Sequence, residues 1–133
     1  MTTPISDLSL LLRSMEPVCN AGVYAYVSVP HATDIAAIPS VAVVREVEGI
    51  TLIVTEDEAL QRQLPVLFRC AWITLHVHSD LQAVGLTAAF AHALGQAGIS
   101  CNVVAGAFHD HIFVPFEKAE AAMDALLRLQ RMS

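Results

Sequence analysis

Charged side chains are scarce in this chain of 133 residues, and basic ones are fewer than acidic ones. Only 15% of the residues are charged, with 7 Lys and Arg against 13 Asp and Glu, for a formal charge of −6. Nucleic acids and anionic membrane surfaces are bound through clustered Lys and Arg, so we expect neither as a partner. Because 55% of the residues are hydrophobic, disorder is also disfavoured. These totals predict one apolar-rich domain or two small packed modules.

Cysteine is rare, and long apolar runs are missing. Cys19, Cys70 and Cys101 are odd in number and widely separated, which disfavours a disulfide framework or a closely spaced metal motif. We predict three buried free thiols in a reducing compartment. No apolar run approaches the roughly 18 residues of a membrane-spanning helix. The segment Met1–Asp7 has no basic flank before its apolar residues, so we expect no signal peptide and a cytoplasmic protein.

The first half of the chain alternates between helical and strand periodicity. The pattern predicts, in order, a helix over 6–15, a strand over 23–29, a loop over 30–40, a hairpin over 41–47 and 50–54, a helix over 56–63 and a long strand over 66–78. Glu48 and Gly49 are predicted to form the two-residue hairpin turn, since glycine accepts the positive φ of such turns. Thr55 is predicted to cap the helix that follows, with Glu58 placed as in a capping box.

The second half has a cleaner pattern. It predicts a helix starting at Gly85–Leu86 and stopped by Gly98, strands over 100–107 and 111–115 joined by a turn over 108–110, and a helix over 117–130. From Trp72 onward the order is strand, helix, strand, strand, helix, a split β-α-β unit that lacks its last strand. Neither half closes a unit alone, and the run 66–78 crosses the middle. We predict an α+β protein of two modules that share strands, over residues 1–69 and 70–133.

Several segments together resemble a known family. They are Trp72–Ser79, Val84–Thr87, Ala97–Val104 and His109–Pro115, with weaker likeness at Glu16–Val18 and Arg45–Leu52. These segments resemble small bacterial proteins built from two tandem ACT-like domains. The resemblance implies two ferredoxin-like modules of βαββαβ type with an antiparallel sheet. It further implies a regulatory protein that binds a small molecule, most often an amino acid, between domains. No region for catalysis accompanies the modules, so we expect neither enzymatic activity nor a cofactor.

The ACT resemblance also marks a candidate ligand loop. In the general ACT pattern, an acidic residue, a proline, a glycine and a leucine link the first strand to the first helix. Asp80, Gly85 and Leu86 match this pattern. Val84 stands where proline is usual, and the stretch between Asp80 and Gly85 is longer than the pattern requires. This departure leaves the shape of the loop open.

Topology places a candidate site at one edge of the predicted sheet. The strand ending at His78 lies antiparallel to the strand beginning at His111, so both sit near the helix N-terminus at 85–87. Free N–H groups there suit a ligand carboxylate, and Asp80 suits an ammonium group. A helix cap and turn without a ligand would use the same residues. The predicted ligand-binding residues are His78, Ser79, Asp80, Val84, Gly85, Leu86, Thr87, Ser100, Asn102, His109 and His111.

The histidines allow a second hypothesis, a metal site. His76 and His78 are two residues apart on a strand, as are His109 and His111, so each pair points to one face. Imidazoles with a nearby Asp coordinate zinc and other transition metals, and we expect His78 and His111 to meet most readily. Histidines bonded to hairpin carbonyls are the simpler alternative. A metal site at His78, His109 and His111 is one alternative function, and a structural or protein-interaction module without a ligand is another.

The sequence also allows a hypothesis about a catalytic thiol and a prediction about oligomer formation. Cys101 with His109 or His111 would make a thiol–imidazole pair, but Cys101 lies mid-strand, where we expect an inert thiol. No phosphate loop, dinucleotide fingerprint or serine elbow is present. The predicted strand 100–107 offers a free sheet edge, and we therefore predict a homodimer.

Overall fold

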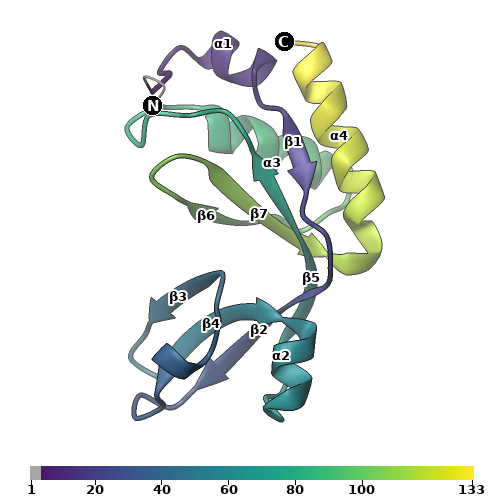
Figure 1. Ribbon diagram of the computed structural model, residues 1–133. Helices are drawn as coiled ribbons and strands as arrows, with labels where there is room; N and C mark the ends of the chain where they lie inside the picture. Colours follow the sequence, from purple (N-terminus) through teal and green to yellow (C-terminus); the bar gives the residue numbers. More distant parts are fainter. Residues whose placement is uncertain (1–3) are drawn as a thin grey trace.

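A computed structural model describes residues 4–133 and is built around one curved antiparallel sheet (Figure 1). In these residues the sheet has seven strands in the order β3-β4-β2-β5-β7-β6, with β1 pairing beside β5. The strands are β1 Pro17–Cys19, β2 Tyr24–Val29, β3 Ala42–Arg45, β4 Ile50–Thr55, β5 Phe68–Leu75, β6 Asn102–Ala105 and β7 Asp110–Pro115. Residues 1–3, which begin the predicted first module and the segment examined for a signal peptide, lie outside the described residues. The predicted α+β class with an antiparallel sheet is confirmed.

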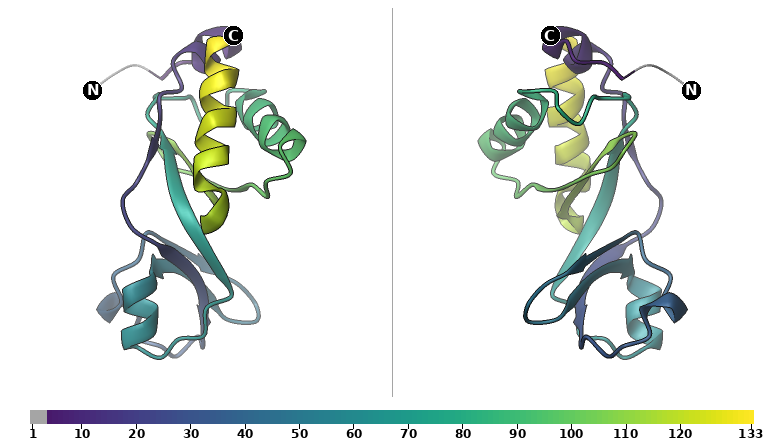
Figure 2. Two further views of the ribbon diagram at one scale, coloured as in Figure 1. Left: turned by 90° about the vertical axis from the view of Figure 1, so that its right-hand side faces the viewer. Right: turned by 90° about the vertical axis from the view of Figure 1, so that its left-hand side faces the viewer.

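The helices gather at two places on this sheet. They are α1 Leu8–Arg13, α2 Glu56–Gln61, α3 Leu86–Gln96 and α4 Ala119–Arg131, with short 3₁₀ turns at Ile35–Ala37 and Phe116–Lys118. Figure 2 shows α3 and α4 lying together over one end of the sheet, with α2 at the other end. The predicted cap of α2 is confirmed, because Glu58 N–H donates to Thr55 Oγ1 at 3.2 Å. None of the described helices is long and apolar enough to cross a membrane.

Strand β5 belongs to both halves of the molecule. Its first part, Phe68–Cys70, pairs with Tyr24–Tyr26 of β2. Its remaining length pairs with β7, and Cys70 lies opposite both Tyr24 and Pro115. The predicted sharing of a strand between two modules is therefore seen at β5. The division into residues 1–69 and 70–133 stays a prediction, since the shared strand runs through it.

The sequence pattern missed β1, which supplies the last strand of the C-terminal unit. Residues 17–19 pair antiparallel with residues 75–73 of β5. The order β1-β5-β7-β6 thus completes the split β-α-β arrangement with a segment from the start of the chain. The strand is only three residues long and begins with Pro17, directly after Glu16 at a φ of 45°. Such a short strand carries no periodicity to detect.

Several predicted boundaries shift. The strand expected over 66–78 is shorter, as β5 ends at Leu75, and the strand expected over 100–107 is reduced to Asn102–Ala105. The hairpin turn predicted at Glu48–Gly49 lies one residue earlier, at Val47 and Glu48. Glu46 N–H donates to the Gly49 carbonyl at 2.8 Å and closes this turn. Gly49 has no positive φ. A Cβ there would lie 2.9 Å from the Val29 carbonyl oxygen, so close approach of the backbone requires glycine.

The neighbouring hairpin and the thiols also depart from expectation. The turn predicted over 108–110 begins one residue earlier, since Gly106 N–H donates to the His109 carbonyl at 2.9 Å.

All three cysteines are free, with Cys70 buried and Cys101 partly buried. Cys19 is exposed, so the prediction of a buried thiol is wrong there. It lies on β1, which covers only one edge of β5.

The main core lies between the sheet and the helices α3 and α4. Ala71, Ile73 and Leu75 of β5 point into it and are buried. The alternate residues of β5, among them Cys70 and Trp72, point to the other face, as side chains on a strand alternate. We call this second side the open face, since the hydrophobic cluster on it draws no residue from the described helices.

Candidate functional site

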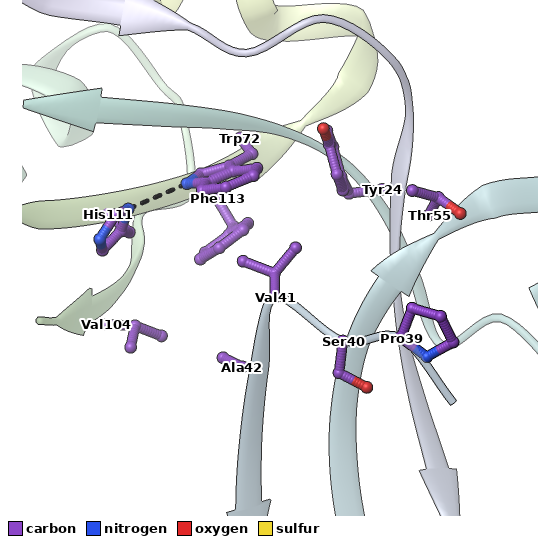
Figure 3. Close-up of a pocket in the computed structure, with 10 residues that line it drawn as sticks. All are labelled: Tyr24, Pro39, Ser40, Val41, Ala42, Thr55, Trp72, Val104, His111 and Phe113. Atoms are coloured by element: carbon purple, nitrogen blue, oxygen red, sulfur yellow. Dashed lines mark hydrogen bonds between the residues drawn. The ribbon is translucent and has the colours of Figure 1, made fainter. Parts of the chain in front are cut away.

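A cavity of about 510 Å³ lies on the open face, between the two halves of the sheet (Figure 3). We call it the central cavity. Its walls come from β2, β5, β6 and β7, from the ends of β3 and β4, and from the segment that leads into β3. The lining residues are Tyr24, Pro39, Ser40, Val41, Ala42, Thr55, Trp72, Val104, His111 and Phe113. The Trp72 ring lies edge-on to Tyr24 at 5.3 Å and stacks on Phe113 at 6.3 Å between ring centroids.

Hydrogen bonds hold the imidazole ring of His111 in one orientation at this cavity. Trp72 Nε1–H donates to His111 Nδ1 at 3.0 Å, as drawn in Figure 3. Because an indole nitrogen can only donate, Nδ1 must accept, and the ring proton lies on Nε2. Thr74 Oγ1 also lies 3.2 Å from Nδ1. Burial lowers the pKa of His111, and His109 lowers it further, which agrees with a neutral ring.

Asn20, just after β1, holds this arrangement from behind. Its side-chain amide donates to Thr74 Oγ1 at 2.9 Å and to the Trp72 carbonyl at 3.1 Å. The register of the sheet places Thr74 opposite His111 and Val18 opposite Thr74. The residue that follows the missed strand therefore contacts the cavity histidine indirectly, through Thr74.

The central cavity carries no full charge among its lining residues, within the part of the chain that the structure describes. Its remaining polar groups already have internal partners: Tyr24 donates to the Ala21 carbonyl at 2.9 Å, and Ser40 donates to the Ile38 carbonyl at 3.0 Å. Such a site suits an apolar or aromatic group that brings few charges.

The predicted ligand loop forms a much smaller space. Ser79, Asp80, Leu86 and Thr87 line a pocket of about 70 Å³ together with Asp110. Ligand pockets usually measure about 300–1,000 Å³, so this pocket alone is small. Ser79 Oγ lies 3.4 Å from Asp110 Oδ2, and this is the contact that ties the loop to β7.

The Asp80 carboxylate already has protein partners. It accepts hydrogen bonds from the Gln82 backbone N–H at 2.9 Å and from Ser6 Oγ at 3.0 Å. These bonds lower its pKa, with the Gln82 contribution the larger. Gly85 has a φ of 106°, a backbone conformation that favours glycine, and a Cβ there would lie 2.9 Å from Leu8 Cδ2. The neighbouring Val84 is 85% exposed, whereas Leu86 is buried in the core.

The predicted site residues therefore separate into several places. Four loop residues line the small pocket, whereas Val84 and Gly85 do not, and His111 lines the central cavity. His78 and His109 line another cavity of about 400 Å³. Ser100 is exposed, and Asn102 donates to the Phe113 carbonyl at 3.3 Å while lining a different cavity of about 410 Å³. Whether any of them binds a ligand stays a prediction.

The histidines pair differently from the expectation. The rings of His76 and His109 lie 5.0 Å apart, and the His78 ring packs on Phe108 at 5.4 Å. His111 instead faces Trp72, so the expected meeting of His78 and His111 does not occur. Within residues 4–133, no three His, Cys, Asp or Glu side chains are grouped so as to hold a metal ion. Burial raises the pKa of the Cys101 thiol, which disfavours a reactive thiolate.

Sequence reasoning missed most of the central cavity. Tyr24, Trp72 and Phe113 come from three strands and meet only through pairing. One local signal was available. Trp72 and Thr74 alternate with the buried aliphatic residues of β5, which marks a second face with a different role.

Two models of the ACT domain match the sequence, over residues 3–71 and 67–128. The chain belongs to the ACT-domain family. The second match begins at residue 67, before the first ends at residue 71, and this overlap lies at the start of the shared strand β5. No curated protein matches this ACT-domain chain.

Solved structures with the same fold include one near relative of this ACT-domain chain. A Vibrio cholerae protein of unknown function, described as a possible transport protein, is 47% identical over 92% of this chain and 95% of its own, with a TM-score of 0.84. An Agrobacterium tumefaciens protein is 17% identical, covering 86% of this chain and 87% of its own, with a TM-score of 0.67. The regulatory subunit of aspartate kinase from Thermus flavus is 15% identical, covering 85% and 95%, with a TM-score of 0.61.

Proposed function

We propose that this ACT-domain protein is a regulatory protein without catalytic activity of its own, and that it binds an amino acid in the central cavity. The observation that carries the proposal is an aromatic-lined cavity of about 510 Å³ between the two modules. Its volume falls within the range of small-molecule sites, and its lining is mainly apolar. Support for a regulatory role comes from the fold shared with aspartate kinase regulatory subunits.

The position of the cavity supports regulation as well as binding. Its walls include Tyr24 and Ala42 from the first module and Val104 and Phe113 from the second. A ligand seated there would contact both, so it would favour one relative arrangement of the two modules over others. A ligand shifts such an equilibrium only by its difference in affinity between the states. A site between modules provides that difference.

A thermal-shift screen of purified, chelator-treated protein against the twenty amino acids and a panel of divalent metals tests the proposal. Ligand at a hundredfold over its dissociation constant adds about 2.7 kcal/mol, which raises the melting temperature by several degrees. We expect a selective rise with one class of amino acid. A rise with metal alone would favour the histidine hypothesis, and no rise at all would favour a structural or interaction role.

A pair of matched variants locates the site. Ala42 lines the central cavity, whereas the adjacent Val43 is 40% exposed and outside it. We expect Ala42→Phe to fill the cavity and abolish the thermal shift by the amino acid, and Val43→Phe to leave it unchanged. Equal binding by both variants would place the ligand elsewhere.

The Asp80–Thr87 loop stays an alternative predicted site. If the ligand binds in the central cavity, Asp80→Ala leaves the affinity for the ligand unchanged, because the Asp80 carboxylate accepts hydrogen bonds from Ser6 and Gln82 and lies outside that cavity. Loss of binding in Asp80→Ala would instead support the loop, whose small pocket a second copy of the chain would then have to enlarge.

We also propose a homodimer and a cytoplasmic location. Among the residues that the structure describes, the outer strands β3 and β6 each pair on one side only, and free sheet edges invite pairing with another chain. Light scattering that gives a monomer mass at all concentrations would contradict the proposed dimer.

The three free thiols agree with a reducing compartment such as the cytoplasm, and cell fractionation tests this location.

A further inference from the structure

We propose that the central cavity selects amino acids with large uncharged side chains through its apolar walls, and that His111, as a neutral imidazole, binds the carboxylate of the ligand by donating from Nε2. This inference rests on the proposed function and names the class of ligand. It follows from the hydrogen bonds of His111, from the absence of charge in the lining and from the aromatic walls.

The protonation of His111 follows from its neighbours. Both hydrogen bonds that the described residues make to its ring go to Nδ1, from Trp72 Nε1 and Thr74 Oγ1. Since indole cannot accept, a proton on Nδ1 would meet the Trp72 N–H head-on at 3.0 Å. The ring is therefore held neutral, with its proton on Nε2.

Some titratable groups around His111 raise its pKa and others lower it. His109, just before β7, lowers the pKa of His111, whereas Asp110 on β7 raises it, and His76, beyond β5, lowers it as well. Strand β6 and the lining segment 39–42 contain no titratable side chain. Burial is the largest influence and favours the neutral ring, in agreement with the bond from Trp72.

The Nε2 nitrogen is free to meet a ligand. No described side-chain nitrogen or oxygen is both buried and without a partner. Nε2 has no hydrogen-bond partner among residues 4–133, so it is accessible. It lies near Gly106, where a Cβ would approach it to 3.3 Å. Because Gly106 is not among the lining residues, this N–H donor lies at the edge of the central cavity, where a carboxylate oxygen of the ligand would accept from it.

The walls determine what the side chain of the ligand can be. Tyr24, Trp72 and Phe113 offer three aromatic surfaces, and Val41 and Val104 add apolar contact. The ammonium and carboxylate groups that every amino acid carries would stay at the open edge of the cavity beside Nε2. A charged side chain enclosed by the walls would lose its water without gaining a counter-charge, which is costly. We therefore expect phenylalanine, leucine or methionine to bind at least ~100-fold more tightly than aspartate or lysine.

The first measurement is ¹⁵N NMR of His111 in the unliganded full-length protein. We expect the Nε2–H tautomer and a pKa below the ordinary value. In Trp72→Phe, which keeps an aromatic ring but loses the indole donor, we expect the pKa of His111 to rise. A predominant Nδ1–H tautomer, or the same pKa in both proteins, overturns the proposal. Because the wild-type spectrum suffices for the tautomer, the test does not depend on the variant folding.

The second measurement is the thermal shift with phenylalanine, leucine, methionine, aspartate and lysine. We expect shifts with the first three, a loss of about tenfold or more in affinity for His111→Leu, and near retention for His111→Gln, whose amide N–H replaces the Nε2 donor. Shifts with aspartate or lysine of equal size, or unchanged affinity in His111→Leu, overturn this inference but leave the proposed function standing. No shift with any of the twenty amino acids overturns both.

Discussion

The two faces of β5 differ in what covers them. On one face, Ala71, Ile73 and Leu75 are buried under α3 and α4 in the main core. On the other, Trp72 and Thr74 join His111 in a hydrogen-bonded network beside the central cavity. One strand thus contributes to stability through one set of side chains and to a candidate binding surface through the other. The alternation of side chains along a strand makes this division possible.

The largest effect is expected from breaking the helix-covered face. Ile73 is fully buried there, so Ile73→Ala removes apolar contact and leaves a cavity. We expect a loss of about 2–5 kcal/mol in the free energy of unfolding, measured by urea denaturation. Val43→Ala, on an exposed strand position, is the control and should change it by less than ~0.5 kcal/mol. Similar losses for both would contradict the assignment of the core.

A smaller effect is expected from loosening the network on the open face. Asn20→Ala removes the amide that donates to Thr74 Oγ1 and leaves that buried hydroxyl with one partner fewer. We expect a loss of about 1–2 kcal/mol in urea denaturation and a change in the NMR signals of the His111 ring. Asn102→Ala is the control, since this exposed amide makes one long bond of 3.3 Å. Unchanged His111 signals in Asn20→Ala would contradict the support that we assign to Asn20.

The rim of the central cavity offers a third comparison. Thr55 lines the cavity and caps α2 through its hydroxyl. We expect Thr55→Ala to lower the free energy of unfolding by about 1 kcal/mol, and Thr55→Ser to keep most of it. If the serine variant is as unstable as the alanine variant, the methyl group rather than the cap is responsible.

The smallest expected effect on stability comes from the ionisation of Asp110, a buried carboxylic acid. Thr74 and Asp110 are the buried polar residues of the described chain, at 4% and 7% exposure. Burial raises the pKa of Asp110, although the bond from Ser79 opposes this. In the folded state the carboxylate is therefore disfavoured, and stability decreases as pH rises from the unfolded value of about 3.9 to the raised folded one. Above the folded pKa this contribution is constant.

Asp110→Asn should remove that pH dependence, because the amide keeps an acceptor toward Ser79 but does not ionise. The measurement is the melting temperature of both proteins between pH 3 and pH 8, and we expect the variant to gain relative to wild type as pH rises. Curves that stay parallel over this range would show that Asp110 ionises in the folded protein as easily as in the unfolded one.

Much of the local structure was predictable from residue patterns. The helix beginning at Leu86, the cap at Thr55 and the strands at 24–29 and 50–55 all carry clear periodic or capping signals. The hairpin turn was misplaced because Gly49 serves close backbone approach rather than a positive φ. The candidate ligand loop was placed by likeness to a family pattern, and the tightness of its pocket follows from Ser6, Asp110 and the loop folding together.

The sequence by itself determined the α+β class, the order of most elements and the apolar sides of the helices, because these depend on neighbours a few residues apart. Only the tertiary structure decided that β1 completes the second unit and that Asn20 reaches Thr74, 54 residues away. It also decided that Tyr24, Trp72 and His111 meet around one cavity. Contacts between distant segments depend on strand register and sheet curvature, which no local pattern of residues encodes.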